Sequence, residues 1–414
     1  MSLIGRFLRG VIKRGTLSLT HPDGTVEHFG AQATGWPDVG IHFLDKRVAR
    51  QIVLDPELGA AEAFMDGRLV VEQGDIMQLV ELLRGNVPWE HGGVLKPAGP
   101  AKIALDRAKT LFDGINGLRA SRANVSHHYD IGNDLYRLFL DQDMQYSCAY
   151  WSSADMTLEA AQFAKKAHIA AKLALAPGQR VLDIGCGWGG MALYLHQKTG
   201  VEVLGITLSA EQLKIAQERA AAAGVSDKVR FELVDYRDLA TREPGSFDRI
   251  VSVGMFEHVG VRNFSTFFRC CTNLMRDDGV MLLHTIGRMD GPGATDAFTR
   301  KYTFPGGYIP ALSETLAASE KWRLIATDIE NLRLHYALTL REWYKRTVAN
   351  KDAIIALQDD RFYRMWTFYL AGATSAFESA NMCNYQLQFS RNRRTLPLTR
   401  DYMGAAETKL LHEG

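Results

Sequence analysis

A glycine-rich turn between Val181 and Gly190, with the sequence VLDIGCGWGG, is the sharpest chemical signal in the chain. An apolar, strand-like run enters the turn and a helix-like run leaves it. Glycines at such a turn adopt positive φ and let a ligand approach the backbone closely. Dinucleotide sites hold a pyrophosphate there, at the helix N-terminus. The turn predicts a nucleotide-like cofactor site, and the structural alternative is a tight turn without a ligand.

The form DxGxGxG, in which Asp183 precedes Gly185 and Gly187, resembles motif I of the S-adenosylmethionine-dependent methyltransferases. Many enzymes of that class place an acidic residue for the ribose hydroxyls after the second strand. This chain has none at that point, and Thr207 and Gln212 supply hydrogen-bonding groups instead.

The third strand is followed by Asp235-Tyr236-Arg237, where the adenine edge is usually held in this class. The ring of Tyr236 is suited to stacking on adenine.

Further residues of chemical type stand at strand ends. Glu257 and His258 follow the fourth strand of the run, and His284 ends the next strand. Cys148 lies in YSCAYW, just before the core. By residue type alone, Glu257 and His258 are compatible with capping the next helix. His284 is compatible with a satisfied core histidine and Cys148 with a small core residue.

Several stretches, in order and at compatible spacing, resemble the cyclopropane-fatty-acyl-phospholipid synthases and their mycolic-acid relatives. They are HYDIGN (128–133), YSCAYW (146–151), VLDIGCGWGG (181–190), GITLS (205–209), GMFEHVG (254–260) and HTIG (284–287). The likeness covers roughly residues 120–400, and the first 100 or so resemble the extra domain of the bacterial phospholipid enzymes. It implies an α/β fold: a Rossmann-like class I methyltransferase core with helical additions over an acyl site, and a smaller N-terminal α+β domain.

The resemblance also implies the reaction. A methylene unit moves from S-adenosylmethionine to the cis double bond of an unsaturated acyl chain in a membrane phospholipid. The alkene attacks the sulfonium methyl, leaving a carbocation, and a bound bicarbonate ion removes a proton so that the ring closes. An anion beside a carbocation in a dry pocket is physically favourable.

Site residues are implied position by position, with no metal among them. Those matching the holders of the ion are Cys148, Glu257, His284 and Tyr336, with the backbone of Ile286. Those matching cofactor contacts are Tyr146, Ser147, Asp183, Gly185, Gly187, Thr207, Leu208, Gln212, Tyr236 and Arg237. The family often has Trp where Tyr236 stands. Many relatives have a cysteine where Ala373 lies, so an essential cysteine nucleophile does not transfer to this chain.

Composition fits this picture. The chain has 414 residues, 46% hydrophobic and 23% charged, with a formal net charge of +1. These values predict an ordinary globular protein of two or three domains and disfavour a strongly basic nucleic-acid binder. The sequence has no run of 18 apolar residues, no secretory signal pattern, and five cysteines without zinc spacing. We therefore expect a reduced, cytoplasmic protein.

The predicted domains are 1–90 for lipid or membrane association, 91–120 as a linker, and 121–414 as the catalytic domain. Residues 16–84 read as an α+β module, with a strand at 40–44 and a mostly helical stretch at 58–83. From 158 to 285, strands alternate with helices and predict a parallel sheet. Residues 290–414 read as mostly helical. Some of their aromatic side chains are candidates for lining the acyl tunnel: Tyr302, Phe304, Trp343, Tyr344, Trp366, Phe368 and Tyr369.

Residues 3–14 form a basic amphipathic pattern. Such a helix either rests on an anionic membrane or docks on its own domain. Together with the resemblance, this predicts peripheral association with the inner face of the membrane, a phospholipid partner and no nucleic acid. We also expect a homodimer.

Three other functions stay open. The same cation intermediate could end in a methyl branch, a methylene group or an alcohol. The catalytic domain could be an inactive lipid-binding domain, although the glycine turn and the ion-holding set are intact. A methyltransferase acting on RNA or a small molecule is disfavoured by the near-neutral charge and the amphipathic N-terminus.

Overall fold

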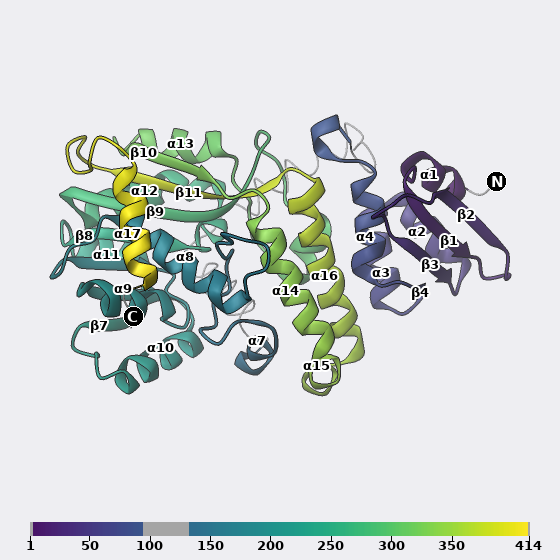
Figure 1. The fold of residues 1–414 in the computed structure, drawn as a ribbon, viewed down its shortest axis with the longest axis horizontal. Helices are drawn as coiled ribbons and strands as arrows, with labels where there is room; N and C mark the ends of the chain where they lie inside the picture. The colour runs from purple at the N-terminus through teal and green to yellow at the C-terminus, as the bar shows by residue number, and fades with distance from the viewer. Residues whose placement is uncertain (1–2, 94–131, 413–414) are drawn as a thin grey trace. The chain divides into compact units, whose positions relative to one another are not determined.

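The computed structural model describes residues 3–93 and 132–412 (Figure 1). The chain packs as two compact units. The first draws on the ranges Met1–Leu105, Asp296–Pro305 and Ala337–Met382, and the second on Asp106–Thr295, Gly306–Tyr336 and Cys383–Gly414. The predicted linker therefore lies mostly outside the described residues, and the assignment of roles to domains stays a prediction. Residues 296–305 and 337–382, expected within the catalytic domain, pack with the first unit.

The first unit contains a four-stranded sheet in the order β2-β1-β3-β4. Its strands are β1 (Gly15–Thr20), β2 (Val26–Ala31), β3 (Asp38–Phe43) and β4 (Leu69–Gln73). The strand predicted at 40–44 is therefore confirmed as β3. The helical reading of 58–83 is wrong in its middle, because β4 separates α3 (Pro56–Met65) from α4 (Ile76–Gly85). The run Leu69-Val70-Val71, set off by Gly67 and Gly74, favours a strand there.

The remaining elements of this unit are helical. Asp45 caps α2 (Lys46–Leu54), Asp55 caps α3, and Asp75 forms a capping box on α4. The segments from the C-terminal half of the chain contribute η4 (Thr299–Thr303), most of α14 (His335–Ala349), α15 (Lys351–Leu357) and α16 (Asp360–Ser379). Helix α16 packs against α3 and α4. A short 3-10 turn, η1 (Trp89–His91), follows α4.

The N-terminal helix α1 (Leu3–Val11) turns its apolar face inward. Ile4, Leu8 and Val11 are buried, and the helix packs against α2 and β2 of the same unit. Arg9 pairs with Glu27 at 2.9 Å. The structure thus supports docking of this helix on its own domain, because the side chains that would enter a membrane are already covered.

We expect Leu8→Ala to lower the free energy of unfolding by about 3 kcal/mol, because it removes a side chain that is 4% exposed and leaves a cavity. Leu3→Ala is the matched control on the same helix. Leu3 is 65% exposed, and its loss should change stability by less than about 0.5 kcal/mol. Urea unfolding of both variants measures the difference. Equal small effects would mean that α1 is not packed as described.

The second unit is built on a seven-stranded sheet in the order β10-β11-β9-β8-β5-β6-β7. The strands are β5 (Arg180–Ile184), β6 (Glu202–Thr207), β7 (Val229–Leu233), β8 (Phe247–Val253), β9 (Met275–Arg288), β10 (Ile325–Asn331) and β11 (Met382–Ser390). The pairs β5–β6, β6–β7, β5–β8 and β8–β9 are parallel, whereas β10 and β11 pair antiparallel. The predicted Rossmann-like α/β core is confirmed.

Two strands were missed in the region read as mostly helical. Along β11, Asn384, Gln386 and Gln388 alternate with apolar residues, which is the period of a strand. Both sets are buried, so β11 lies inside the sheet and carries one polar face.

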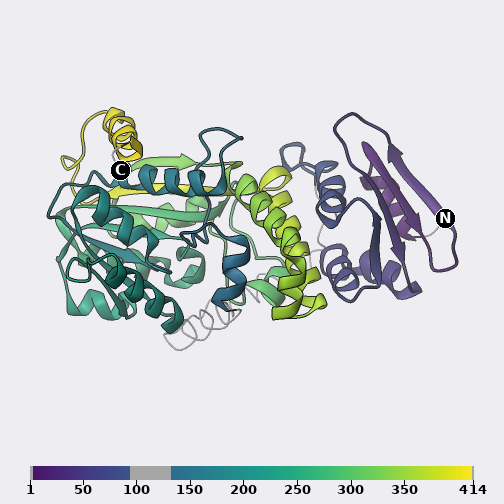
Figure 2. The same cartoon turned by 60° about the horizontal axis from the view of Figure 1, so that its bottom comes forward.

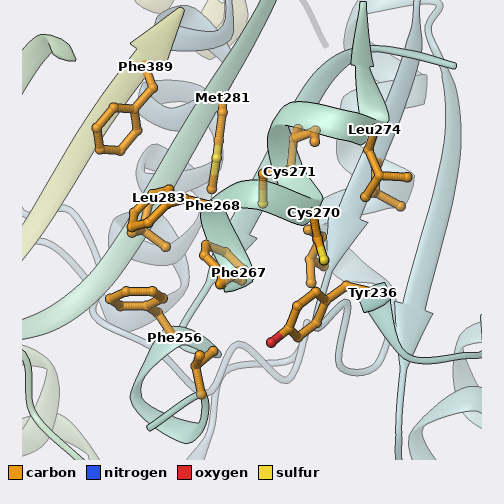
Figure 3. Close-up of a cluster of buried hydrophobic side chains, with 14 of the residues drawn as sticks. Tyr236, Phe256, Phe267, Phe268, Cys270, Cys271, Leu274, Met281, Leu283 and Phe389 are labelled. Atoms are coloured by element: carbon orange, nitrogen blue, oxygen red, sulfur yellow. The ribbon is translucent and has the colours of Figure 1, made fainter. Parts of the chain in front are cut away.

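Helices cover both faces of the sheet (Figures 1 and 2). One face packs α8 (Leu158–Leu173), α9 (Gly190–Thr199), α10 (Ala210–Ala222) and α17 (Asp401–His412), with α17 beside α8. The other packs α11 (Tyr236–Arg242), η2 (Phe256–His258), α12 (Phe264–Leu274) and α13 (Leu312–Glu320). On this second face, phenylalanines of η2 and α12 meet Met281 and Leu283 of β9 and Phe389 of β11 (Figure 3). Two further elements are α7 (Asn133–Phe139) and η3 (Val261–Asn263).

Candidate active site

The glycine turn lies at the carboxyl end of β5 and leads into α9. Gly185 and Gly187 have φ of 83° and 53°, in the region that favours glycine. The N–H of Gly185 donates to the carbonyl of Ile206 at 2.9 Å, which ties the turn to β6. A Cβ placed on Gly185 would lie 2.8 Å from the Cβ of Met255. The turn therefore needs glycine for its backbone angle and for its close packing.

We expect Gly185→Ala to weaken S-adenosylhomocysteine binding at least about thirtyfold, because the added Cβ displaces the turn and strains its backbone. Gly178→Ala is a matched control. Its φ is 78°, and a Cβ there would meet nothing within 4 Å. Isothermal titration calorimetry on both variants separates the general cost of positive φ from damage to the site. Similar affinities in the two variants would contradict the assignment of the turn.

The two predicted ribose-side residues lie together at the end of β6. The hydroxyl of Thr207 donates to Oε1 of Gln212 at 3.1 Å and accepts from the N–H of Ser209 at 3.2 Å. Ser209 caps α10 through the N–H of Gln212. Both predicted side chains are buried, and the cap brings the first turn of α10 back over the strand end. Leu208, the remaining predicted residue here, lies between Thr207 and Gln212 in the sequence, and these two side chains are bonded to each other.

The predicted adenine-side residues begin α11. Asp235 caps that helix and holds the guanidinium of Arg237 through Nε at 2.7 Å and Nη2 at 2.8 Å. The ring of Tyr236 is 8% exposed and meets Phe267 edge-on, with centroids 5.4 Å apart (Figure 3). Tyr236 is thus part of a rigid apolar wall, and its stacking on adenine stays a prediction.

The YSCAYW segment is tied to α8. Gln162 donates from Nε2 to the carbonyl of Ser147 at 2.9 Å, and Lys165 donates from Nζ to the Ser147 hydroxyl at 2.8 Å. Cys148 is 1% exposed, and burial raises the pKa of its thiol. Its Sγ donates to the carbonyl of Ala149 at 3.3 Å. Cys148 is therefore a neutral thiol and a weak donor.

Glu257 reaches across to the end of β9. Its Oε1 accepts the N–H of Ile286 at 2.6 Å, and its Oε2 is buried without a hydrogen-bond partner among the described residues. Burial raises the pKa of this carboxyl to about 7, although the Ile286 N–H and the Thr285 hydroxyl favour ionisation. The elements that follow, η3 (Val261–Asn263) and α12, have no side-chain cap at their N-termini, so the alternative that Glu257 and His258 cap the next helix is wrong.

The hydrogen bond from Ile286 to Glu257 also affects the predicted role of the Ile286 backbone, which was expected to contact the ion. That N–H is already engaged by the carboxylate. A contact between this N–H and an ion would have to be shared with Glu257.

His284 is held by two side chains that the sequence analysis missed. Nδ2 of Asn384 lies 3.1 Å from Nε2 of the imidazole, and Nε2 of Gln386 lies 3.2 Å from Nδ1. His284 is 1% exposed, and burial, with repulsion from Lys165, keeps its pKa well below the ordinary value. The ring is therefore neutral and fixed in orientation by the polar face of β11.

Tyr336 lies at the start of α14 and is 8% exposed. The preceding residue, His335, accepts the N–H of Trp151 on Nδ1 at 2.9 Å. The ring of Tyr150 is stacked on His168, at 4.0 Å between centroids, and on His335, at 5.0 Å. These contacts connect the Cys148 segment with the residue next to Tyr336.

All the predicted site residues belong to the second unit. Those from Ser147 to His284 gather at the strand ends of one sheet. Sequence analysis missed Gln145, Lys165, Asn384 and Gln386. The alternation along β11 could have revealed the last two, whereas a lysine in a helix is normally read as exposed, and the sequence gives no sign that α8 is buried on nearly every side. The first four residues of the HYDIGN motif, 128–131, lie outside the described residues. Its last residue, Asn133, accepts a hydrogen bond from the indole N–H of Trp188 at 2.8 Å.

The aromatic candidates for the acyl tunnel all lie in the first unit. Phe368 packs against Phe64 at 6.2 Å and against Phe298 at 5.2 Å, and Trp366 packs against Tyr369 at 5.1 Å between centroids. Ala373 lies on α16. Cys383 lies on β11 and is fully buried in the apolar core, so it does not replace the missing cysteine.

The geometry agrees with comparisons to known proteins. The sequence profile of the family described as "Mycolic acid cyclopropane synthetase" matches residues 117–387. The chain is 40% identical over 345 residues to the cyclopropane-fatty-acyl-phospholipid synthase of Escherichia coli, covering 83% of this chain and 85% of that protein. It is 32% identical to the tuberculostearic acid methyltransferase UfaA1 of Mycobacterium tuberculosis, covering 93% and 90%.

Among solved structures, the chain is similar to the mycolic acid cyclopropane synthase CmaA1 complexed with SAH and CTAB. That match has a TM-score of 0.61 and 36% identity, and covers 65% of this chain and 98% of that one. The family profile spans well over half of the chain, and the Escherichia coli relative covers most of it. On these two matches, this chain belongs to the mycolic acid cyclopropane synthetase family.

Proposed function

We propose that this protein is an S-adenosylmethionine-dependent cyclopropane-fatty-acyl-phospholipid synthase. It would transfer a methylene unit to the cis double bond of an unsaturated phospholipid acyl chain. The observation that carries the proposal is Glu257, a buried carboxylate with one oxygen bonded to the backbone and the other without a partner among the described residues. Such an oxygen is suited to take a proton within a dry site.

Two observations support a fit between the residues of the glycine turn and S-adenosylmethionine. The glycine turn is open at Gly187, where a Cβ would meet nothing within 4 Å, and Oδ2 of Asp183 is buried without a hydrogen-bond partner in the described part of the chain. Burial raises the pKa of Asp183 to about 7. When bound, S-adenosylmethionine supplies an electrophilic methyl group. The glycine turn would then fix the position of that ligand, and Thr207 and Gln212 would face its ribose.

The residues fit a bicarbonate ion in part. Oε2 of Glu257 is suited to accept a hydrogen bond from the hydroxyl of the ion. The thiol of Cys148 is a weak donor that already bonds the carbonyl of Ala149, so it would exchange that partner for the ion. The ring nitrogens of His284 and the N–H of Ile286 already have partners, so they would share or exchange them. We infer that Glu257 carries the proton away and that the other residues hold the ion's orientation.

A second product is favoured by one comparison, since a relative along most of the chain is named a tuberculostearic acid methyltransferase. A methylene-branched product, which keeps one C=C bond, would arise from the same methyl transfer if the cation lost a different proton; a saturated methyl branch would in addition need a hydride donor. Both products lose one proton overall, so the residues that take it up do not decide between them.

The product is tested with monounsaturated phospholipid vesicles and methyl-labelled S-adenosylmethionine. We expect a mass gain of one CH₂ that survives mild hydrogenation and gives ring proton signals in NMR. The same gain in a hydrogenatable or branched chain would establish the second product. If the cofactor binds but no mass is gained, the protein acts on a different substrate or is an inactive lipid-binding protein.

We expect removal of bicarbonate and CO₂ from the assay to lower the initial rate at least about tenfold, since a missing general base typically costs this much or more. Adding back bicarbonate at constant pH and ionic strength should restore the rate, and chloride at the same concentration should not. A rate that is independent of bicarbonate would remove the ion from the mechanism.

We also propose that the protein works as a homodimer in peripheral contact with the cytoplasmic face of the membrane. A phospholipid substrate requires contact with a bilayer, and among the described residues no helix is long and apolar enough to cross one. The packing of α1 argues that another surface makes the contact. Co-sedimentation with anionic and neutral vesicles tests the association, and light scattering tests the dimer.

A further inference from the structure

Lys165 is a buried cation that none of the family-matched positions includes. It lies on α8 and is 0% exposed. Its Nζ donates to Oε1 of Gln145 at 2.6 Å and to Oγ of Ser147 at 2.8 Å. Both partners are neutral, and no carboxylate of the described residues comes within ion-pair distance of Nζ. Buried charges in proteins are normally paired, whereas the ammonium of Lys165 lacks a direct counter-ion among the described residues.

The surroundings of Nζ belong to the cofactor turn. The side-chain amide of Gln145 lies 2.5 Å from where a Cβ on Gly190, at the start of α9, would stand. The Cβ of Ser147 lies 3.8 Å from the equivalent point on Gly254, directly after β8. In open α/β sheets, ligands bind at the carboxyl ends of the strands, where these residues lie.

Lys165 determines which atoms donate and which accept in its hydrogen bonds with Gln145 and Ser147. An ammonium has three donors and no acceptor, and two of its donors are used by Gln145 and Ser147. Because Oγ of Ser147 accepts from Lys165, its own hydrogen is left to donate elsewhere. Asp183, whose Oδ2 has no partner within the described ranges, is attracted by the charge of Lys165. The patch thus offers a cation, a hydroxyl donor and a carboxylate acceptor.

That combination is complementary to an α-amino acid zwitterion. We propose that Lys165, together with the hydroxyl of Ser147, binds the carboxylate at the methionyl end of the cofactor. This inference rests on the proposed S-adenosylmethionine dependence and assigns one end of that ligand to specific donors. A ligand carboxylate would supply the direct counter-ion that the described side chains do not.

The charge balance around Lys165 is consistent with this role. The groups that act on it are Asp141, Asp143 and Cys148 from the preceding segment, and Lys166 on its own helix. Asp183 of β5 and His284 of β9 also feel its charge. Burial lowers the pKa of Lys165 to about 8, so the ammonium predominates at neutral pH.

The test compares two ligands that differ by the carboxylate alone: S-adenosylhomocysteine and its decarboxylated analogue, S-adenosyl-3-thiopropylamine. Isothermal titration calorimetry gives the preference of wild-type protein for the first ligand, which we expect to be at least about tenfold. In Lys165→Met this preference should fall to within about threefold, mainly through weaker S-adenosylhomocysteine binding. Ser147→Ala should lower the preference in the same direction.

Lys172→Met is the matched control. Lys172 is also a buried lysine and lies two helical turns further along α8, but it pairs with Glu330. We expect this variant to lower the unfolding temperature while leaving the ligand preference unchanged. Thermal unfolding of all variants shows that the proteins compared are folded.

The outcomes are distinct. Collapse of the preference in Lys165→Met, but not in Lys172→Met, supports the assignment. Equal weakening of both ligands would make Lys165 a structural residue only, and unchanged affinities would remove it from the site, so either result overturns the inference. If wild-type protein binds neither ligand, the proposed function itself fails.

Discussion

Glu257→Gln should lower kcat about a hundredfold to a thousandfold while S-adenosylhomocysteine affinity changes less than about threefold. The amide keeps the shape of the side chain and can still accept the N–H of Ile286 through its oxygen. It cannot take up a proton, and loss of a positioned base commonly costs this much. Single-turnover rates and calorimetry measure the two quantities separately. A near-wild-type rate would exclude the relay.

The same substitution should stabilise the protein at alkaline pH. Burial gives Glu257 a folded-state pKa of about 7 against an ordinary value of 4.5, so ionisation disfavours the folded state. The sign is that of an acid with a raised pKa: the penalty is absent below about pH 4.5, grows as pH rises to about 7, and is full above. It corresponds to on the order of 3 kcal/mol. Thermal unfolding at pH 5 and pH 8 should therefore show a gain for Glu257→Gln only at pH 8.

A suitable control for both effects is Glu314→Gln. Glu314 also accepts a backbone N–H, from Ala311 at 2.9 Å, but it caps α13 and bonds the hydroxyl of Tyr308. We expect its activity to stay within about twofold of wild type. A loss of activity as large as that of Glu257→Gln would show that the assay responds to packing and not to proton transfer.

Asp143→Ala should lower the free energy of unfolding by roughly 3 kcal/mol at pH 7. The carboxylate accepts from Lys166 at 2.5 Å, from Arg219, and from Gln145 at 3.0 Å, so its removal leaves two cations unpaired. Burial alone would raise the pKa of Asp143, but Lys166 and Arg219 outweigh it and lower the pKa. The stabilisation is therefore present at neutral pH and is lost as pH falls below about 4.

Asp134→Ala provides the comparison. Asp134 pairs with Arg137 at 2.7 Å on the surface, with 74% of its side chain exposed, and its loss should cost less than about 0.5 kcal/mol. Urea unfolding at pH 7 measures both variants. Because Asp143 also orients Gln145, Asp143→Ala should weaken S-adenosylhomocysteine binding as well. Equal stabilities of the two variants would mean that the Asp143 network is no stronger than a surface pair.

The alternating core was predictable from sequence because its strands are short apolar runs and its helices are amphipathic. Helix α8 begins at Leu158, where the alternating run was predicted to begin. The strands β4, β10 and β11 were missed for a different reason. They lie between helical segments, and β11 is not an apolar run because it carries buried amides on one face, so the polar–apolar alternation was its only sign of a strand.

The site residues that belong to a local sequence motif were predictable. Gly185 and Glu257 follow β5 and β8, as the local pattern predicted. His284 was expected to end its strand, but β9 continues to Arg288, and His284 lies within it, paired with the last residue of β8. The alternation along β11 marks Asn384 and Gln386 as one face of a strand, but no local pattern contains their contacts with His284 or the burial of Lys165, which join residues 18 to 102 positions apart. The bond between Glu257 and the Ile286 N–H is of the same kind.

The interleaving of the two units has a consequence for synthesis. The chain leaves the second unit at Tyr336 and returns at Cys383, and β11 lies between β10 and β9 in the finished sheet. A nascent chain that has emerged only as far as residue 381 has all of β9 and β10 but lacks the strand that joins them. His284 then has neither Asn384 nor Gln386 beside it. The histidine therefore acquires the two side chains that fix its orientation only near the end of translation.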